Sequence, residues 1–222
     1  MSEIKEISVL DHGNVALVDF LGDDLAVVQG ARISNGAALP DWRGAPDERL
    51  IAFLAENGHM SPFEHAVAKF YVKAPLFVVR EWQRHRTFSY NERSGRYKEF
   101  DPEFYIPTSW RAPDPQNKQS SIDLGPNLYA EGLYLTSCLR SFKQYERLLS
   151  AGVAREMARM VLPLSTYTEF YATGNFRNWM HFLSLRNTPE AQWEIRMYAQ
   201  AIAEILKEKM PLSFAALTGM VD

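Results

Sequence analysis

The chain has 222 residues, of which 46% are hydrophobic and 23% are charged, with a formal net charge of −3. This composition is typical of a soluble globular protein that buries a sizeable core, as one large domain or two small ones. A general nucleic-acid binder needs a basic face to neutralise many phosphates, so the acidic balance argues against one.

Hydrophobic patterning in the first half of the chain predicts a hairpin, two helices, a strand and a third helix. The hairpin pairs residues 4–10 with 15–21. Helices are expected at 24–33 and 47–57, followed by a strand at 66–73. Pro75 then opens a helix whose apolar start gives way to charged residues, so its end carries charge out of the core.

The second half begins with residues 108–126, in which three prolines alternate with polar residues, as is typical of a mobile loop or lid. Helices are predicted at 127–150, 154–161, 175–185 and 189–209, and a strand at 165–173. Strands scattered among unequal helices, without a βαβ repeat or a glycine-rich fingerprint, favour an α+β fold.

Residues 84–97 read RHRTFSYNERSGRY and contain four arginines. Arginine binds phosphate oxygens in bidentate fashion, backbone N–H groups of Ser and Gly can surround a phosphate, and Asn91 and Glu92 can address hydroxyls or a base edge. Between Arg80 and Lys98, six cations stand against two anions, a local charge of +4. The segment predicts a basic cleft for a small phosphorylated ligand, beginning on a helix end and continuing into a loop.

Three further segments could carry chemistry. Residues 58–65 contain two histidines and a glutamate but no third strong ligand at a usual spacing, so we predict no metal site; the polar groups bind a ligand or shape the turn. Arg155 and Arg159 lie one helical turn apart, either on a solvated face or on a partly buried helix. Arg177 and His181 share a helix face, and Asn175 before them contacts a ligand or caps the helix.

The single cysteine, Cys138, lies among apolar residues of the helix predicted at 127–150. A nucleophilic thiol needs cationic neighbours and access, so we interpret Cys138 as a buried structural residue.

We expect a reducing, cytoplasmic location, because no secretion signal or membrane-spanning run is visible. Hydrolase and kinase motifs are missing. Ser94 has no evident base, so we interpret it as a ligand contact.

Five motifs in order resemble the flavin-dependent thymidylate synthases: GHMSPFEH, RHR followed by ERSGRY, REMARMVLP, NFR to LR, and QWEIR. The resemblance covers about residues 5 to 215. It implies that residues 1–222 form a single domain with a central β-sheet flanked by helices. It also implies that dUMP becomes dTMP, with 5,10-methylenetetrahydrofolate as one-carbon donor and NADPH-reduced FAD as hydride source, so that flavin replaces a cysteine nucleophile.

The family assembles as a homotetramer with active sites between subunits, which implies that a pocket takes Arg96 from one subunit and Arg159 from its neighbour. Arg186, the implied catalytic residue, faces the N3 edge of the pyrimidine, where a cation stabilises negative charge. Glu81 stands where relatives often carry Gln, and His181 where some carry Asn. The residues implied around FAD are His59, Ser61, Arg84, His85, Arg86, Glu92, Asn175, Arg177 and His181, and those around dUMP are Glu81, Trp82, Gln83, Arg84, Glu92, Arg93, Ser94, Gly95, Arg96, Arg159 and Arg186.

Two other functions stay open. The first is a flavin- or nucleotide-binding protein without methyl-transfer activity. The second is an RNA-binding module that uses the arginines and aromatic residues of the basic segment for stacking. The absorbance spectrum of a bound flavin in the purified protein would argue against the RNA-binding module. An assay of turnover separates the enzyme from the binding protein without methyl-transfer activity.

Overall fold

The structure is a computed structural model that describes residues 5–37 and 39–219. Within these residues it contains a five-stranded antiparallel sheet and a separate two-stranded sheet. The small sheet pairs β5 (Trp110–Pro113) with β6 (Ser121–Gly125). The strands of the large sheet, in spatial order, are β1 (Glu6–Val9), β2 (Gly13–Leu21), β3 (Val67–Pro75), β7 (Tyr167–Asn175) and β4 (Ser89–Glu92).

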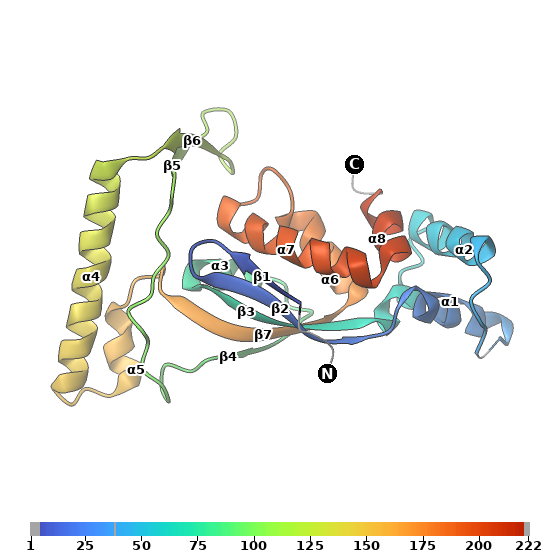
Figure 1. Ribbon diagram of the computed structural model, residues 1–222, viewed down its shortest axis with the longest axis horizontal. Coiled ribbons are helices and arrows are strands. Elements are labelled where there is room, and N and C mark those ends of the chain that lie inside the picture. Colours follow the sequence, from blue (N-terminus) through green and yellow to red (C-terminus); the bar gives the residue numbers. More distant parts are fainter. Residues whose placement is uncertain (1–4, 38, 220–222) are drawn as a thin grey trace.

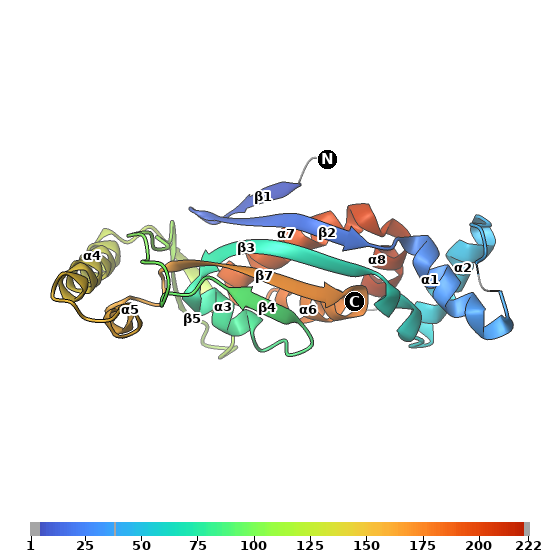
Figure 2. The same ribbon diagram turned by 90° about the horizontal axis from the view of Figure 1, so that it is seen from below.

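Helices α6 and α7 cover one face of the large sheet, with α3 and α8 beside them (Figure 1 and Figure 2). We call this the helix-covered face and the other the open face, over which no described helix lies. Helices α1 and α2 stand at one end of the sheet, and α4 and α5 stand at the other. We call α4, α5 and the 3-10 turn that follows them, Arg159–Val161, the arm. The helices are α1 (Asp24–Arg32), α2 (Ala45–Glu56), α3 (Leu76–Trp82), α4 (Leu128–Ser150), α5 (Arg155–Ala158), α6 (Phe176–Arg186), α7 (Trp193–Lys209) and α8 (Pro211–Thr218).

An aromatic cluster fixes the helices on the sheet. Because strand side chains alternate between faces, Phe70 of β3 points to the helices and its neighbour Tyr71 to the open face. Phe70 packs edge-on against Trp179 of α6, with ring centroids 4.9 Å apart. Trp82 at the end of α3 lies 4.8 Å from Phe182 of α6. Burying such a side chain stabilises the fold by roughly 1.5–3 kcal/mol, so this cluster anchors α3 and α6.

The arm has a small core of its own. Cys138 and Phe142 of α4 pack with Phe104 and Ala158. Cys138 is only 2% exposed, and its Sγ lies 3.6 Å from Ser165 Oγ. This burial confirms the interpretation of Cys138 as a structural thiol.

The central antiparallel sheet flanked by helices confirms the predicted α+β fold class. The N-terminal hairpin forms as expected, with Ile7 opposite Val15. Asn175 caps α6, since its Oδ1 accepts a hydrogen bond of 2.9 Å from the backbone N–H of Asn178. In the described residues, no helix combines the length and apolar character that crossing a membrane requires.

Several predicted boundaries were wrong. Residues 89–92 are not loop but strand β4, because they pair with β7. Residues 108–126 are not structureless, because β5 and β6 form a hairpin there; their mobility stays a prediction. The helix predicted at 154–161 is α5 followed by a 3-10 turn. Helix α7 begins at Trp193 rather than 189, because residues 188–191 form a hydrogen-bonded turn, and α8 was not predicted.

Candidate active site

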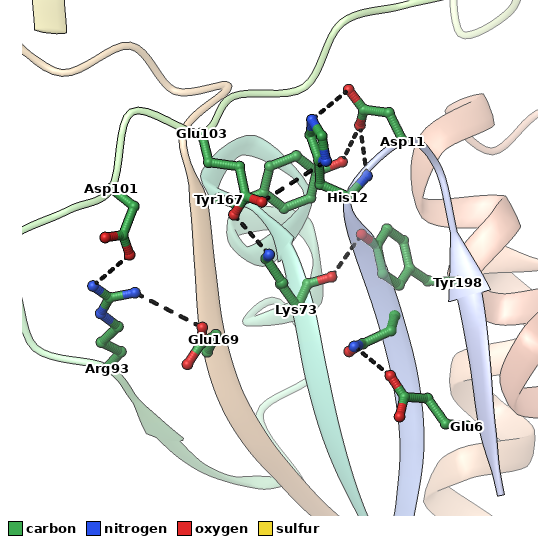
Figure 3. Close-up of polar contacts among 11 residues, drawn as sticks. Glu6, Asp11, His12, Lys73, Arg93, Asp101, Glu103, Tyr167, Glu169 and Tyr198 are labelled. Atoms are coloured by element: carbon green, nitrogen blue, oxygen red, sulfur yellow. Dashed lines mark hydrogen bonds and ion pairs between the residues drawn. The ribbon is translucent and has the colours of Figure 1, made fainter.

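The basic segment 84–97 leaves α3, follows β4 along the edge of the sheet and reaches both of its faces. Glu92 accepts a hydrogen bond of 3.0 Å from Oγ1 of Thr168, which is buried under the helices. The next residue, Arg93, lies on the open face, where its Nη1 is 3.7 Å from Glu169 Oε1 (Figure 3). One continuous segment therefore presents polar groups on opposite faces of the sheet.

The turn after β4 meets the arm and forms an arginine cluster, which consists of Ser94, Gly95, Arg96 and Arg159. A Cβ at Gly95 would lie 3.1 Å from Arg159 Cδ, so turn and arm are in direct contact. Arg96 Nε is 2.9 Å from Oε2 of Glu156 on α5, and its backbone N–H donates to Ser94 Oγ at 3.3 Å. Within one chain, Arg96 and Arg159 therefore lie close together, which differs from the expected division between subunits; the subunits that contribute to a pocket stay a prediction.

Arg186, the last residue of α6, makes three contacts with Glu81 and His85 on the helix-covered side. Its Nε donates to His85 Nε2 at 3.1 Å, its Nη1 lies 3.2 Å from Glu81 Oε2, and its Nη2 donates to the Glu81 carbonyl at 3.3 Å. Burial, with help from the nearby Arg186 and His181, lowers the pKa of His85 to about 4. Neutral His85 can therefore accept the Arg186 N–H at neutral pH.

A cavity of about 740 Å³ opens between α6 and the turn after α2. Asn175, Arg177 and His181 line it from the α6 side, so the structure brings together three residues that the sequence grouped. Arg177 Nη1 makes an ion pair of 2.6 Å with Oε1 of Glu64. Met60 and other apolar side chains complete the wall. Such a mixture of apolar wall and few polar groups is typical of a small-molecule site.

Comparison with known proteins gives consistent results. The Thy1 family, described as "Thymidylate synthase complementing protein", matches residues 16–212. A flavin-dependent thymidylate synthase of Thermus thermophilus is 53% identical over 212 residues, covering 95% of this chain and 77% of the relative. That of Kosmotoga olearia is 48% identical over 214 residues, covering 95% and 92%. The chain belongs to the flavin-dependent thymidylate synthase family.

A solved structure extends this family assignment to the fold. The UMP/dUMP methylase PolB from Streptomyces cacaoi, bound with 5-Br dUMP, matches with a TM-score of 0.85 and 37% identity. The match covers 96% of this chain and 97% of PolB. The same enzyme bound with 5-Br UMP gives a TM-score of 0.82.

The remaining residues that the family resemblance implies are spread around these sites. His59 and Ser61 are exposed beside Gly58 and Met60, which line the cavity. Arg84 and Arg86 are exposed on either side of buried His85. The ligand roles of all these residues stay predictions.

Two observations refine the residue set. Trp82 is fully buried in the aromatic cluster, backbone included, while Gln83 beside it is exposed. Glu64 had no assigned role, although it lies in a motif that the sequence singled out; its ion pair with Arg177 connects positions that are 113 apart in sequence. Among the described residues, no group of three His, Cys, Asp or Glu side chains is placed to hold a metal ion.

Proposed function

We propose that this chain is a flavin-dependent thymidylate synthase, which methylates dUMP to dTMP with methylenetetrahydrofolate as one-carbon donor and NADPH as reductant. The observation that carries the proposal is a fixed arginine, Arg186, in a family member whose single cysteine is buried. Arg186 is connected to the cavity through His85, which accepts its Nε–H and lies 6.1 Å, between ring centroids, from His181 of the cavity wall. Cys138 lies in the small core of the arm and cannot act as a nucleophile without unfolding it.

The cavity residues fit FAD. The Arg177 guanidinium suits a pyrophosphate, the Asn175 side chain supplies polar contacts, and Met60 and Met180 supply an apolar surface for a ring system. We propose that His59, Ser61, Arg84, His85, Arg86, Glu92 and His181 complete this binding site. Bound in this cavity, FAD would supply the redox chemistry, with NADPH as the reductant.

The nucleotide would use the arginine cluster and the Arg186 site together. Arg96 and Arg159 are exposed cations next to the backbone of Gly95, which suits a phosphate. Arg186 would face the base, where its charge stabilises negative charge that develops on the pyrimidine. The remaining nucleotide contacts that we propose are Trp82, Gln83, Arg84, Glu92, Arg93 and Ser94. Glu81, which the family resemblance implies among them, we assign to Arg186 instead.

We further propose a homotetramer whose sites combine residues from different subunits. The arginine cluster follows Arg93, which lies on the open face, and is formed where the basic segment contacts the arm. Arg186, in contrast, packs against His85 on the helix-covered side. The arm also exposes large apolar side chains, among them Leu128, Leu139 and Met160 at 83%, 59% and 72%. Exposed apolar surface of this kind marks a protein interface, and a second copy of the chain is the partner that a closed homo-oligomer requires. A cytoplasmic location stays a prediction.

An anaerobic single-omission assay tests the function. Purified protein is mixed with FAD, NADPH, methylenetetrahydrofolate and dUMP, and the nucleotides are separated by chromatography. We expect dTMP in the complete mixture only, and none when one component is left out. Protein that saturates with flavin and dUMP but forms no dTMP would instead be a flavin- and nucleotide-binding protein without methyl-transfer activity.

A further inference from the structure

Glu81 is a half-buried carboxylate at the end of α3, and its surroundings are unusual. Its Oε2 is 3.2 Å from Arg186 Nη1, but its Oε1 is buried without a hydrogen-bond partner in the part of the chain that the structure describes. Burial raises the pKa of this carboxyl, and the Arg186 guanidinium opposes the shift. A buried carboxylate with one satisfied oxygen is costly, which suggests a use for the charge beyond packing.

The contacts around Arg186 indicate that use. A guanidinium has five N–H donors in a rigid fork. Three of them are taken by His85 Nε2, by Glu81 Oε2 and by the Glu81 carbonyl. One donor is left on each Nη, so Arg186 keeps two donors for an acceptor outside this set. The three contacts together fix the position and the orientation of the guanidinium group.

We infer that Glu81 is a positioning residue that, together with neutral His85, holds Arg186 ready for the base. This inference rests on the proposed function. Without the carboxylate, the long arginine side chain gains rotational freedom and the two remaining donors lose their fixed positions. Glu81 acts on the reaction only through Arg186, and that separates it from a residue that touches the nucleotide itself.

The charged and titratable groups around this carboxylate come from three elements. Arg186 faces it from α6, Glu194 adds negative charge from α7, and His85 follows it in the chain with His181 of α6 beside that ring. Protonation of Glu81 removes the charge that pairs with Arg186. The protonated carboxyl keeps an acceptor oxygen, as the amide of Glu81→Gln does. We therefore expect the wild-type turnover number to fall by no more than about threefold as the pH decreases through the raised pKa of Glu81, toward the value of Glu81→Gln, in which this limb should be missing.

A double-mutant cycle tests the inference, with Glu81→Ala, Glu81→Gln, Arg186→Ala and Glu81→Ala/Arg186→Ala. We expect Glu81→Ala to lower kcat roughly 10- to 100-fold, as misplaced groups do, with a smaller change in KM for dUMP. Glu81→Gln keeps an acceptor oxygen for Arg186 and should stay within about threefold of wild type at neutral pH. The double variant should be no slower than Arg186→Ala alone. Glu208→Gln, which removes an exposed partner of Lys5 at 2.6 Å, is the matched control and should leave kcat unchanged.

Three results would overturn the inference: unchanged kcat in Glu81→Ala, losses that multiply in the double variant, or the same acid limb in wild type and Glu81→Gln. If Glu81→Ala does not fold, the cycle is run with Glu81→Gln at neutral pH, where the smaller loss of this variant should likewise vanish in the Arg186→Ala background. Calorimetric titration with dUMP gives the cycle a readout without turnover, in which Glu81→Ala should weaken binding only when Arg186 is present. Wild-type protein that binds dUMP but forms no dTMP contradicts the proposed function, whereas a Glu81 effect that persists without Arg186 contradicts only the positioning role.

Discussion

Gly95 packs against the aliphatic stem of Arg159, so closely that a Cβ at position 95 would lie 3.1 Å from Arg159 Cδ. This contact joins the turn after β4 to the arm and places two segments of the arginine cluster beside each other in one chain. It depends on the missing side chain, because the neighbours leave no room for a methyl group. Glycine is the residue that permits such a close approach.

Gly95→Ala should therefore displace Arg159 or Phe100, both of which a Cβ would crowd. We expect dUMP binding to weaken at least tenfold, about 1.4 kcal/mol, while FAD binding stays unchanged. Calorimetric titration measures both. Gly132→Ala is the control: nothing lies within 4 Å of its Cβ position on α4, and the change should stabilise the helix by roughly 0.5–1 kcal/mol. Equal dUMP affinity in wild type and Gly95→Ala would show that the Gly95–Arg159 contact is not part of the dUMP-binding site.

Arg159 and Arg177 should separate the two ligands. Arg159→Ala removes a charge-assisted phosphate contact worth roughly 1.5–3 kcal/mol. The binding free energy of dUMP should weaken by that amount, and the dissociation constant of FAD should change little. Arg177→Ala should do the reverse, and so should His181→Ala. Flavin fluorescence and dUMP calorimetry report the two constants, with exposed Arg49→Ala as control. Loss of both ligands in every variant would indicate a folding defect rather than two sites.

His85 should make stability depend on pH. Its folded-state pKa is lowered to about 4, whereas an unfolded histidine titrates near 6.5. Between these values the unfolded chain binds more protons than the native one, so the free energy of unfolding falls as the pH decreases from about 6.5 to 4. His85→Gln should flatten this slope in urea unfolding, and exposed His12→Gln should not. Parallel curves for wild type and His85→Gln would contradict a neutral, buried His85.

The elements that the sequence predicted well are those specified locally. The Asn175 cap and the N-terminal hairpin depend on neighbouring residues, and both formed as expected. Strand β4 was missed because its four residues are held by pairing with distant β7. The same holds for the candidate site. Arg177 and His181 share one helix, and the sequence grouped them correctly. The Glu81–Arg186 pair spans 105 positions, and the Gly95–Arg159 contact joins a turn to the arm, so no local pattern contains either.

The two halves of the proposed shared site give a complementation test. If one pocket combines Arg159 of one subunit with Arg186 of another, then Arg159→Ala and Arg186→Ala should each be nearly inactive and regain activity when co-expressed. Arg96→Ala with Arg159→Ala should not recover, because both residues belong to the same cluster of one chain. Hetero-oligomers are confirmed with two affinity tags. Recovery in the second pair and none in the first would mean that the subunit assignment is wrong.

The central claim, thymidylate synthesis without a protein thiol, is tested most directly by the turnover of Cys138→Ala. Cys138 is the only cysteine, so this variant contains no thiol at all. We expect the variant to lose roughly 1 kcal/mol of stability, as a small buried side chain is removed. Loaded with FAD and supplied anaerobically with NADPH, methylenetetrahydrofolate and dUMP, it should form dTMP at a rate within about threefold of wild type, since buried structural thiols are inert. A folded, flavin-loaded Cys138→Ala protein that forms no dTMP, beside an active wild type, would contradict the account.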